Sequence, residues 1–306
     1  MGAMDTTRKL IGRGAHKLEF TAWVVFLLAA MILGTCPSNA YADGGRLLAT
    51  GGVTQLEGAA GGGIVPWALI GGYGTRDEIG ATGFATYVDT GHFDLLTAGA
   101  TIGFYDRFEL SFARQRFNLG RTVPGASIEQ DVVGAKLKLY GDAVFDQDRW
   151  WPQLALGVQY KRNLDFDFVP ALLGAQDRDG IDIYLAATKL YLAGLYGRNV
   201  LLNATVRATR ANQFGLLGFG GDRHDDYQPQ FEGSAAVFLT DALALGAEFR
   251  TRPNNLRSFK ENDIFDLFAS WLPNKHLAVT VAYTDLGRIA NRSNENAWYV
   301  SAQVSY

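Results

Sequence analysis

The chain has few of the residues that build disulfide-rich or loop-rich folds, with 1 Cys and 8 Pro among 306 residues. A single cysteine excludes an intramolecular disulfide framework. After residue 33, no apolar run is long enough to cross a bilayer as a helix, so the pattern is not that of a helical membrane protein with several spans. A net charge of −3 with no stripe of Lys and Arg argues against nucleic acid as a partner.

The first 42 residues have the pattern of a secretory signal peptide. Basic residues precede a mostly apolar run at 20–33, and Ala40-Tyr41-Ala42 supplies the small-x-small motif of a cleavage site. We expect cleavage after Ala42 and a mature chain that starts near Asp43. An uncleaved membrane anchor is one alternative. Acylation of Cys36 is another, although Thr35 stands where a lipoprotein has a small residue.

Glycine and aromatic residues are plentiful, at 36 Gly and 12% aromatic, a composition that favours strands and tight turns. In the mature chain, apolar and polar residues alternate with a period of two, as in half-buried strands. The final segment shows this most clearly, because Trp298, Val300, Val304 and Tyr306 share one face. The expected strands are 46–57, 64–73, 80–89, 94–104, 108–117, 127–140, 152–161, 181–192, 199–209, 227–239, 242–252, 262–272, 276–285 and 297–306.

These segments predict an all-β fold over residues 43–306, a transmembrane antiparallel meander β-barrel of about fourteen strands, within a range of roughly 12 to 16. Long and short connections alternate along the chain, as in barrels whose termini both lie in the periplasm, although 142–151 is long where a short turn is expected. Glycines at 58–63 leave residues 43–79 open to two placements, as wall strands or as a plug in the lumen.

Closure distinguishes this barrel from a soluble sheet, which alternates in the same way. A long meander must protect its edges, and pairing the last strand with the first removes them. We expect Trp298, Val300, Val304 and Tyr306 to form that seam on the lipid face, with the terminal Tyr306 as the aromatic end that is common in bacterial outer-membrane barrels. The implied partners are outer-membrane lipid and the barrel-assembly machinery, and the implied location is the outer membrane of a Gram-negative bacterium.

Two segments carry a resemblance to a known family. The sequence GGRLLATGGVTQLEGAAGGGIVPWALIGGYGTRDEIG at 44–80 and GFYDRFELSFARQRF at 103–117 resemble a proteobacterial family catalogued only as a domain of unknown function and predicted to be exported to the outer membrane. The resemblance extends over the mature chain. It implies location and architecture, and it supplies no activity and no functional residue.

Ionisable residues on the inward faces are the candidate functional residues. The register predicts that Glu232 lies opposite Arg250, Ser234 opposite Glu248 and Leu239 opposite Leu243. Two interpretations stay open, a water-filled pathway for solutes or a core of paired charges. The ten expected lumen-facing charges are Glu109, Lys136, Lys138, Lys161, Asp182, Arg207, Glu232, Glu248, Arg250 and Asp266, with Asp266 in reach of Arg250.

Catalytic motifs are scarce. His92, His224 and His276 lie in connections or at a strand start, and no Gly-x-Ser-x-Gly elbow accompanies them, so we do not expect an enzyme. The acidic loop 222–226 is interpreted as a solvated loop rather than a metal site, and no cofactor is predicted. A passive channel or transporter for small solutes is the first hypothesis. The alternatives are an outer-membrane enzyme or binding protein, and a structural or adhesive barrel.

Overall fold

The computed structural model describes residues 46–289 and 292–306. The predicted signal peptide, its cleavage site after Ala42, and Cys36 lie outside the described residues. In the described part of the chain, no helix is long and apolar enough to cross a membrane.

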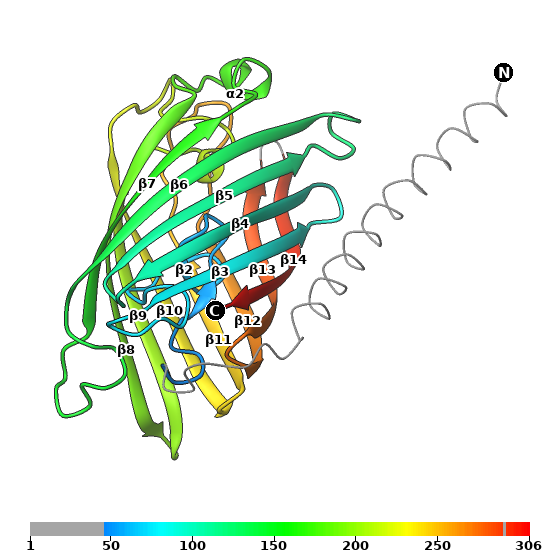
Figure 1. Ribbon diagram of the computed structural model, residues 1–306. Coiled ribbons are helices and arrows are strands. Elements are labelled where there is room, and N and C mark those ends of the chain that lie inside the picture. The colour runs from blue at the N-terminus through cyan, green and yellow to red at the C-terminus, as the bar shows by residue number, and fades with distance from the viewer. Residues whose placement is uncertain (1–45, 290–291) are drawn as a thin grey trace, which may run out of the picture. The chain divides into compact units, whose positions relative to one another are not determined.

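In the described part of the chain, twelve antiparallel strands close into one barrel in which each strand pairs with its neighbour in sequence and the last pairs with the first (Figure 1). The predicted meander barrel is therefore confirmed, with twelve strands in place of about fourteen, at the lower limit of the expected range of roughly 12 to 16. The strands are β3 (Ile79–Asp89), β4 (Asp94–Phe104), β5 (Phe108–Asn118), β6 (Ser127–Tyr140), β7 (Gln153–Asn163), β8 (Asp179–Leu195), β9 (Arg198–Thr209), β10 (Gln228–Thr240), β11 (Leu243–Arg250), β12 (Ile264–Asn274), β13 (Leu277–Ile289) and β14 (Arg292–Ser305).

Short connections such as 105–107 and 196–197 mark one end of the barrel, which we call the turn end. Long connections at 119–126, 164–178, 210–227 and 251–263 mark the other, the loop end. The connection 141–152 is long although it lies at the turn end. The loop end also carries a short helix α2 (Val169–Leu172) and a 3-10 turn η1 (Gln213–Gly215).

The register follows the hydrophobic alternation. Phe104 pairs with Phe108 and Ile102 with Leu110 across the β4–β5 turn, so apolar side chains share the outer face. The β10–β11 hairpin departs from expectation only near its turn. There Thr240 pairs with Leu243 in place of Leu239, because a bulge shifts the register by one residue.

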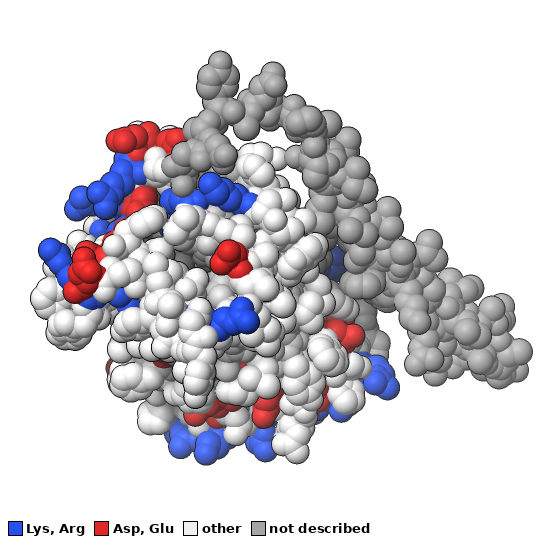
Figure 2. All heavy atoms as spheres, turned by 90° about the horizontal axis from the view of Figure 1, so that it is seen from below, with Lys and Arg blue, Asp and Glu red and all other residues white. Residues whose placement is uncertain are grey.

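The outer surface of the barrel wall is apolar between two aromatic rims. Exposed aromatic residues lie near the turn end at Phe108 and Trp271, and near the loop end at Tyr160 and Trp298. Seen from the turn end, the charged side chains form separate groups with a broad uncharged surface between them (Figure 2). Between the rims the exposed side chains are Ile102, Leu110, Phe112, Val133, Leu156, Val158, Ile183, Leu185, Leu202, Val206, Leu245, Leu267, Val281 and Val300.

Residues 46–78 precede the wall and fill the lumen, with β2 in blue inside the barrel (Figure 1). We call this segment the plug. Its regular structure is the pair β1 (Val53–Thr54) and β2 (Ala60–Gly61), so the expected strands 46–57 and 64–73 are wrong and the plug placement is the one adopted. The chain turns at Gly58, whose φ of +94° favours glycine. The plug residues before and after this turn are buried.

The seam forms between β14 and β3. Val300 pairs with Tyr87, and Trp298 with Asp89, while Tyr306 exchanges two backbone hydrogen bonds with Ala81 of 2.7 and 2.8 Å. Trp298, Val300, Val304 and Tyr306 all face outward. The last strand thus closes on β3 and not on a strand at 46–57, because that segment belongs to the plug.

Candidate functional site

Six charged side chains of the described residues meet inside the lumen, three cations and three anions. Lys161, Arg207 and Arg250 come from β7, β9 and β11, and Asp182 and Glu232 from β8 and β10. The sixth member, Glu57, belongs to the plug. Each of these side chains is at most 5% exposed, so we call the set the central charge network.

Glu57 contacts all three cations of the central charge network. Its carboxylate pairs with Lys161 Nζ, accepts a hydrogen bond of 2.7 Å from Arg250 Nη1 and lies 3.6 Å from Arg207 Nη2. Burial opposes the ionised form, but the three surrounding cations outweigh it and hold the pKa of Glu57 well below its ordinary value. The plug therefore contributes a negative charge inside the barrel at neutral pH.

The wall supplies the remaining anions. Arg207 Nε lies 2.5 Å from Glu232 Oε1, and Lys161 Nζ lies 2.6 Å from Asp182 Oδ2. The cross-strand partner expected for Arg250 is present, because Arg250 Nε lies 3.3 Å from Glu232 Oε1. Equal numbers of each sign in contact keep the buried set neutral, which is the condition for burying charges at tolerable cost.

Aromatic rings flank two of the guanidinium groups. Arg250 lies 4.4 Å from the centre of the Phe214 ring, and Arg207 lies 5.1 Å from that of Tyr184. Phe214 belongs to the 210–227 connection at the loop end, so the network touches the wall, the plug and a long loop together. The central charge network thus occupies a packed interior, which corresponds to the paired-core alternative for the conformation described.

A second ion pair holds the backbone of the plug. Lys136 Nζ lies 3.1 Å from Glu109 and donates hydrogen bonds of 2.9 and 2.8 Å to the carbonyls of Ala60 and Leu69. Glu109 accepts hydrogen bonds from the backbone N–H groups of Ala60 and Gly71, at 3.2 and 2.8 Å. One cation and one anion therefore satisfy backbone groups that the plug cannot pair internally.

The other predicted residues have separate roles. Glu248 accepts hydrogen bonds from Ser234 Oγ at 2.6 Å and from the backbone N–H of Ile64 at 2.8 Å. Asp266 lies opposite Glu248 in the ladder, and no ion pair joins it to Arg250 among the described residues, so the expected contact is wrong. Lys138 sits at the turn end, where its Nζ lies 2.7 Å from Asp106.

Neutral polar residues of the wall also bind the plug. Gln115 Nε2 and Thr101 Oγ1 donate to the plug carbonyls of residues 56 and 58, at 2.9 and 2.7 Å. Thr54 Oγ1 of the plug donates to Gln303 Oε1 of β14 at 2.9 Å. The inward polar face that the alternation predicts thus pairs with the backbone and side chains of the plug in this conformation.

Sequence reasoning missed Glu57, the residue on which the network converges. One signal was present: Glu57 is the only charged residue between Arg46 and Arg76. A single carboxylate in a long uncharged, glycine-rich segment requires a buried partner once that segment is enclosed. The alternation used to find strands carries no information about it.

The acidic loop 222–226 makes local contacts at the loop end. Asp225 lies 2.8 Å from Arg210, and Asp222 accepts a hydrogen bond of 2.9 Å from the backbone N–H of Arg257. In the described part of the chain, no three His, Cys, Asp or Glu side chains are grouped as metal ligands.

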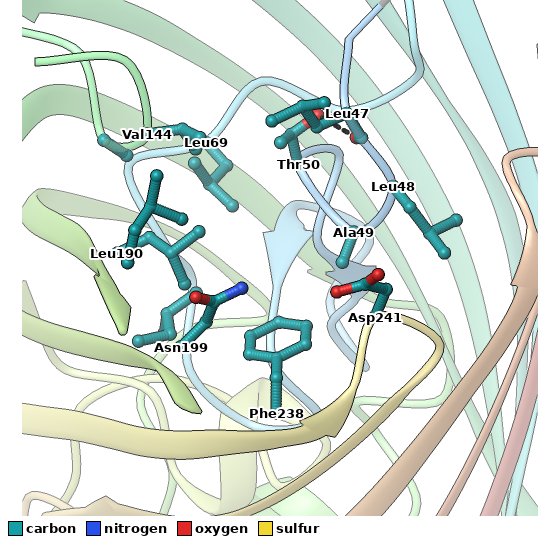
Figure 3. A pocket seen from close by; sticks show the side chains of 13 residues that line it. Leu47, Leu48, Ala49, Thr50, Leu69, Val144, Leu190, Asn199, Phe238 and Asp241 are labelled. Carbon is teal, nitrogen blue, oxygen red and sulfur yellow. Dashed lines mark hydrogen bonds between the residues drawn. The ribbon is translucent and has the colours of Figure 1, made fainter. Parts of the chain in front are cut away.

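A cavity of about 290 Å³ lies between the plug and the wall at the turn end (Figure 3). Leu47 and Leu69 of the plug face Leu190 and Phe238 of the wall across it, and Asp241 at the β10–β11 turn lies at its edge. Its lining is mainly apolar.

Residues 50–303 match the family described as "Protein of unknown function (DUF3034)". The chain belongs to this family. The match includes residues 50–78 of the plug and the twelve strands up to residue 303 of β14, so plug and wall are both parts of the family domain. No curated protein matches the chain.

Solved structures that align with this chain have differing descriptions. The KdgM porin aligns with a TM-score of 0.46 and 10% identity over 74% of this chain and 99% of its own. An outer membrane channel from Pseudomonas putida F1 aligns with a TM-score of 0.40 and 10% identity, over 79% of this chain and 97% of its own. The translocator domain of the autotransporter NalP from Neisseria meningitidis aligns with a TM-score of 0.34 and 11% identity, over 74% of this chain and 86% of its own. At TM-scores below 0.5, these alignments carry no argument about this chain.

Proposed function

We propose that this DUF3034 protein is an outer-membrane β-barrel that passes small solutes and is held shut by its N-terminal plug. Location is supported by the apolar band between aromatic rims and by the closed ladder, since a strand crosses lipid only when its backbone groups are paired. The barrel-assembly machinery would recognise the C-terminal strand that ends at Tyr306.

The observation that carries the gating part is the central charge network between plug and wall. Six buried charges are a poor permanent seal, because apolar residues of similar volume often stabilise a core as well or better. When the plug leaves, however, each charge regains its hydration, which lowers the cost of opening compared with an apolar seal of equal area. The network therefore suits a plug that moves.

An open barrel would be lined by the predicted inward charges. Lys161, Asp182, Arg207, Glu232 and Arg250 would line one side of the lumen, on the adjacent strands β7 to β11, with Glu109, Lys136, Glu248 and Asp266 elsewhere on the wall and Lys138 at the turn end. Loss of Glu57 from the lumen leaves three cations against two anions on that side, so the open state favours anionic solutes at that point.

Glu57→Gln tests the gate in planar bilayers. The amide keeps the size of the side chain and removes the charge that joins plug to wall, so we expect channel openings at least ten times as frequent as in the wild type. Glu129→Gln is the matched control. Glu129 forms a partly exposed ion pair with Arg116, at 3.9 Å, and the variant should behave as wild type. Retained heat-modifiable migration on gels would show that each barrel is folded.

A reversible cross-link between Thr54→Cys and Gln303→Cys, in the Glu57→Gln background, then ties the plug to β14. Openings should cease on cross-linking and return on reduction, and the single-cysteine variants should not respond. Folded Glu57→Gln protein without current, or current that persists through the cross-link, would reject a gate made by the plug.

A further inference from the structure

A second cavity, of about 110 Å³, lies inside the barrel at the loop end and is distinct from the one in Figure 3. Leu56 of the plug forms part of its lining, Phe93 and Phe117 line it from the β3–β4 connection and β5, and Phe214 and Leu217 line it from the 210–227 connection. We call it the loop-end cavity. Its position places it between the long loops and the central charge network.

The loop-end cavity offers almost nothing to a polar molecule. Its border includes the threonines at 90 and 122, and also Gln213, Arg252 and Asp94, each of which is engaged elsewhere. Gln213 Nε2 donates to Glu261 at 3.1 Å, Arg252 Nε donates to the carbonyl of residue 262 at 2.6 Å, and Asp94 accepts from the side chain of residue 118 at 2.6 Å. A polar solute entering this space would lose its hydration without compensation.

We propose that the loop-end cavity binds one small apolar molecule with a single aromatic ring. An apolar cavity of about 150 Å³ stays dry and binds benzene, and this one is of comparable size. Phe93 and Phe117 stack with centroids 5.5 Å apart, which gives the ligand a ring face and edges to pack against. The inference rests on the proposed function in naming the class of solute, although binding itself requires no transport.

The ligand would contact the two groups that adjoin the central charge network from this side. Leu56 precedes Glu57, and the Phe214 ring lies 4.4 Å from the Arg250 guanidinium. A molecule in the loop-end cavity therefore touches the plug at Leu56. It also touches the Phe214 ring, which covers Arg250, one of the cations that bind Glu57 of the plug. A ligand bound in this cavity would lie next to the central charge network, on its loop-end side.

Fluorobenzene is the probe, and its binding to the folded full barrel in lipid nanodiscs is measured by ¹⁹F NMR. We expect a saturable bound resonance with one site per chain. Phe117→Trp and Val123→Phe, which fill the cavity from the wall and from the 119–126 loop, should each weaken this binding at least tenfold. Phe112→Trp is the matched control, because Phe112 lies on the same strand but is 44% exposed on the outer face.

Linear partition of the probe, equal in all four proteins, would overturn the assignment. So would saturable binding that survives in folded Val123→Phe, which decides the matter even where Phe117→Trp fails to fold. The readout is independent of current: saturable binding in a barrel whose Glu57→Gln variant is silent removes the gate and keeps the site, whereas gated current without saturable binding removes the site and keeps the gate.

Discussion

Glu57 shows how three wall cations fix the state of one plug carboxylate. Burial favours the neutral acid, but Arg250, Lys161 and Arg207 favour the ion more strongly, so the folded pKa falls below the ordinary 4.5. Because the folded pKa is lowered, this contribution to stability is complete above pH 4.5 and is lost only as the pH falls through the folded value. At neutral pH the plug anchor does not titrate.

Arg250→Ala should destabilise the barrel with its plug by about 3 to 5 kcal/mol, because it leaves Glu57 and Glu232 buried with fewer counter-charges. Had the lumen been solvated, the same change would cost about 0.2 to 1 kcal/mol. Urea unfolding in detergent, followed by tryptophan fluorescence with buried Trp67 as the plug reporter, measures the difference.

Arg114→Ala is the control, since Arg114 forms an exposed pair with Asp131 on the outside of the wall. It should leave the unfolding midpoint nearly unchanged. An Arg250→Ala midpoint that matches that of Arg114→Ala would show that the central charge network is wet.

Among the elements, the 251–263 connection contains a buried titrating group. Burial raises the pKa of Glu261 to about 7, and Arg252 and the backbone N–H of Gln213 offset only part of that effect. Because this folded pKa is raised, the stabilisation of the loop is complete below pH 4.5 and is lost as the pH rises through about 7.

We expect the 251–263 connection to exchange amide hydrogens faster at about pH 8 than at about pH 5, after correction for the intrinsic rate, with a difference of up to about 3 kcal/mol in opening free energy. Glu261→Gln should remove this pH dependence. Equal dependence in both proteins would place the titration on another group.

The β14–β3 seam depends on the lipid face of its last strand. Val300→Asp puts a charge on the outer face and should cost up to about 2 kcal/mol near the membrane midplane, because acidic side chains cost less there than Arg or Lys. The fraction of heat-modifiable, outer-membrane protein measures it. Val300→Thr keeps the branched shape without charge and should assemble far better than Val300→Asp, while equal yields of the two would contradict the lipid-facing register.

At the scale of the whole chain, export is predicted from the basic start, the apolar run and Ala40-Tyr41-Ala42. N-terminal sequencing of membrane-derived protein should begin at or within a few residues of Asp43. A mature protein that retains Trp23 would favour the anchored alternative.

The sequence by itself determined the wall of the barrel. A period of two sorts side chains between lipid and lumen without reference to distant residues, and turn lengths then fix the register. The strands from 79 onward and the placement of Glu232 opposite Arg250 therefore follow from local pattern. The bulge at Leu239 does not follow from local pattern, because a turn that shifts the pairing by one residue leaves the alternation of the strands unchanged.

Only the tertiary structure decided the fate of residues 46–78 and the meaning of the inward charges. Local pattern cannot distinguish a wall strand from an enclosed segment, because both bury apolar residues and the choice depends on whether the remaining twelve strands already close. Once Glu57 enters the lumen, it draws Lys161, Arg207 and Arg250 onto one carboxylate. Such long-range Coulomb contacts exist only after closure places four separate segments around one point.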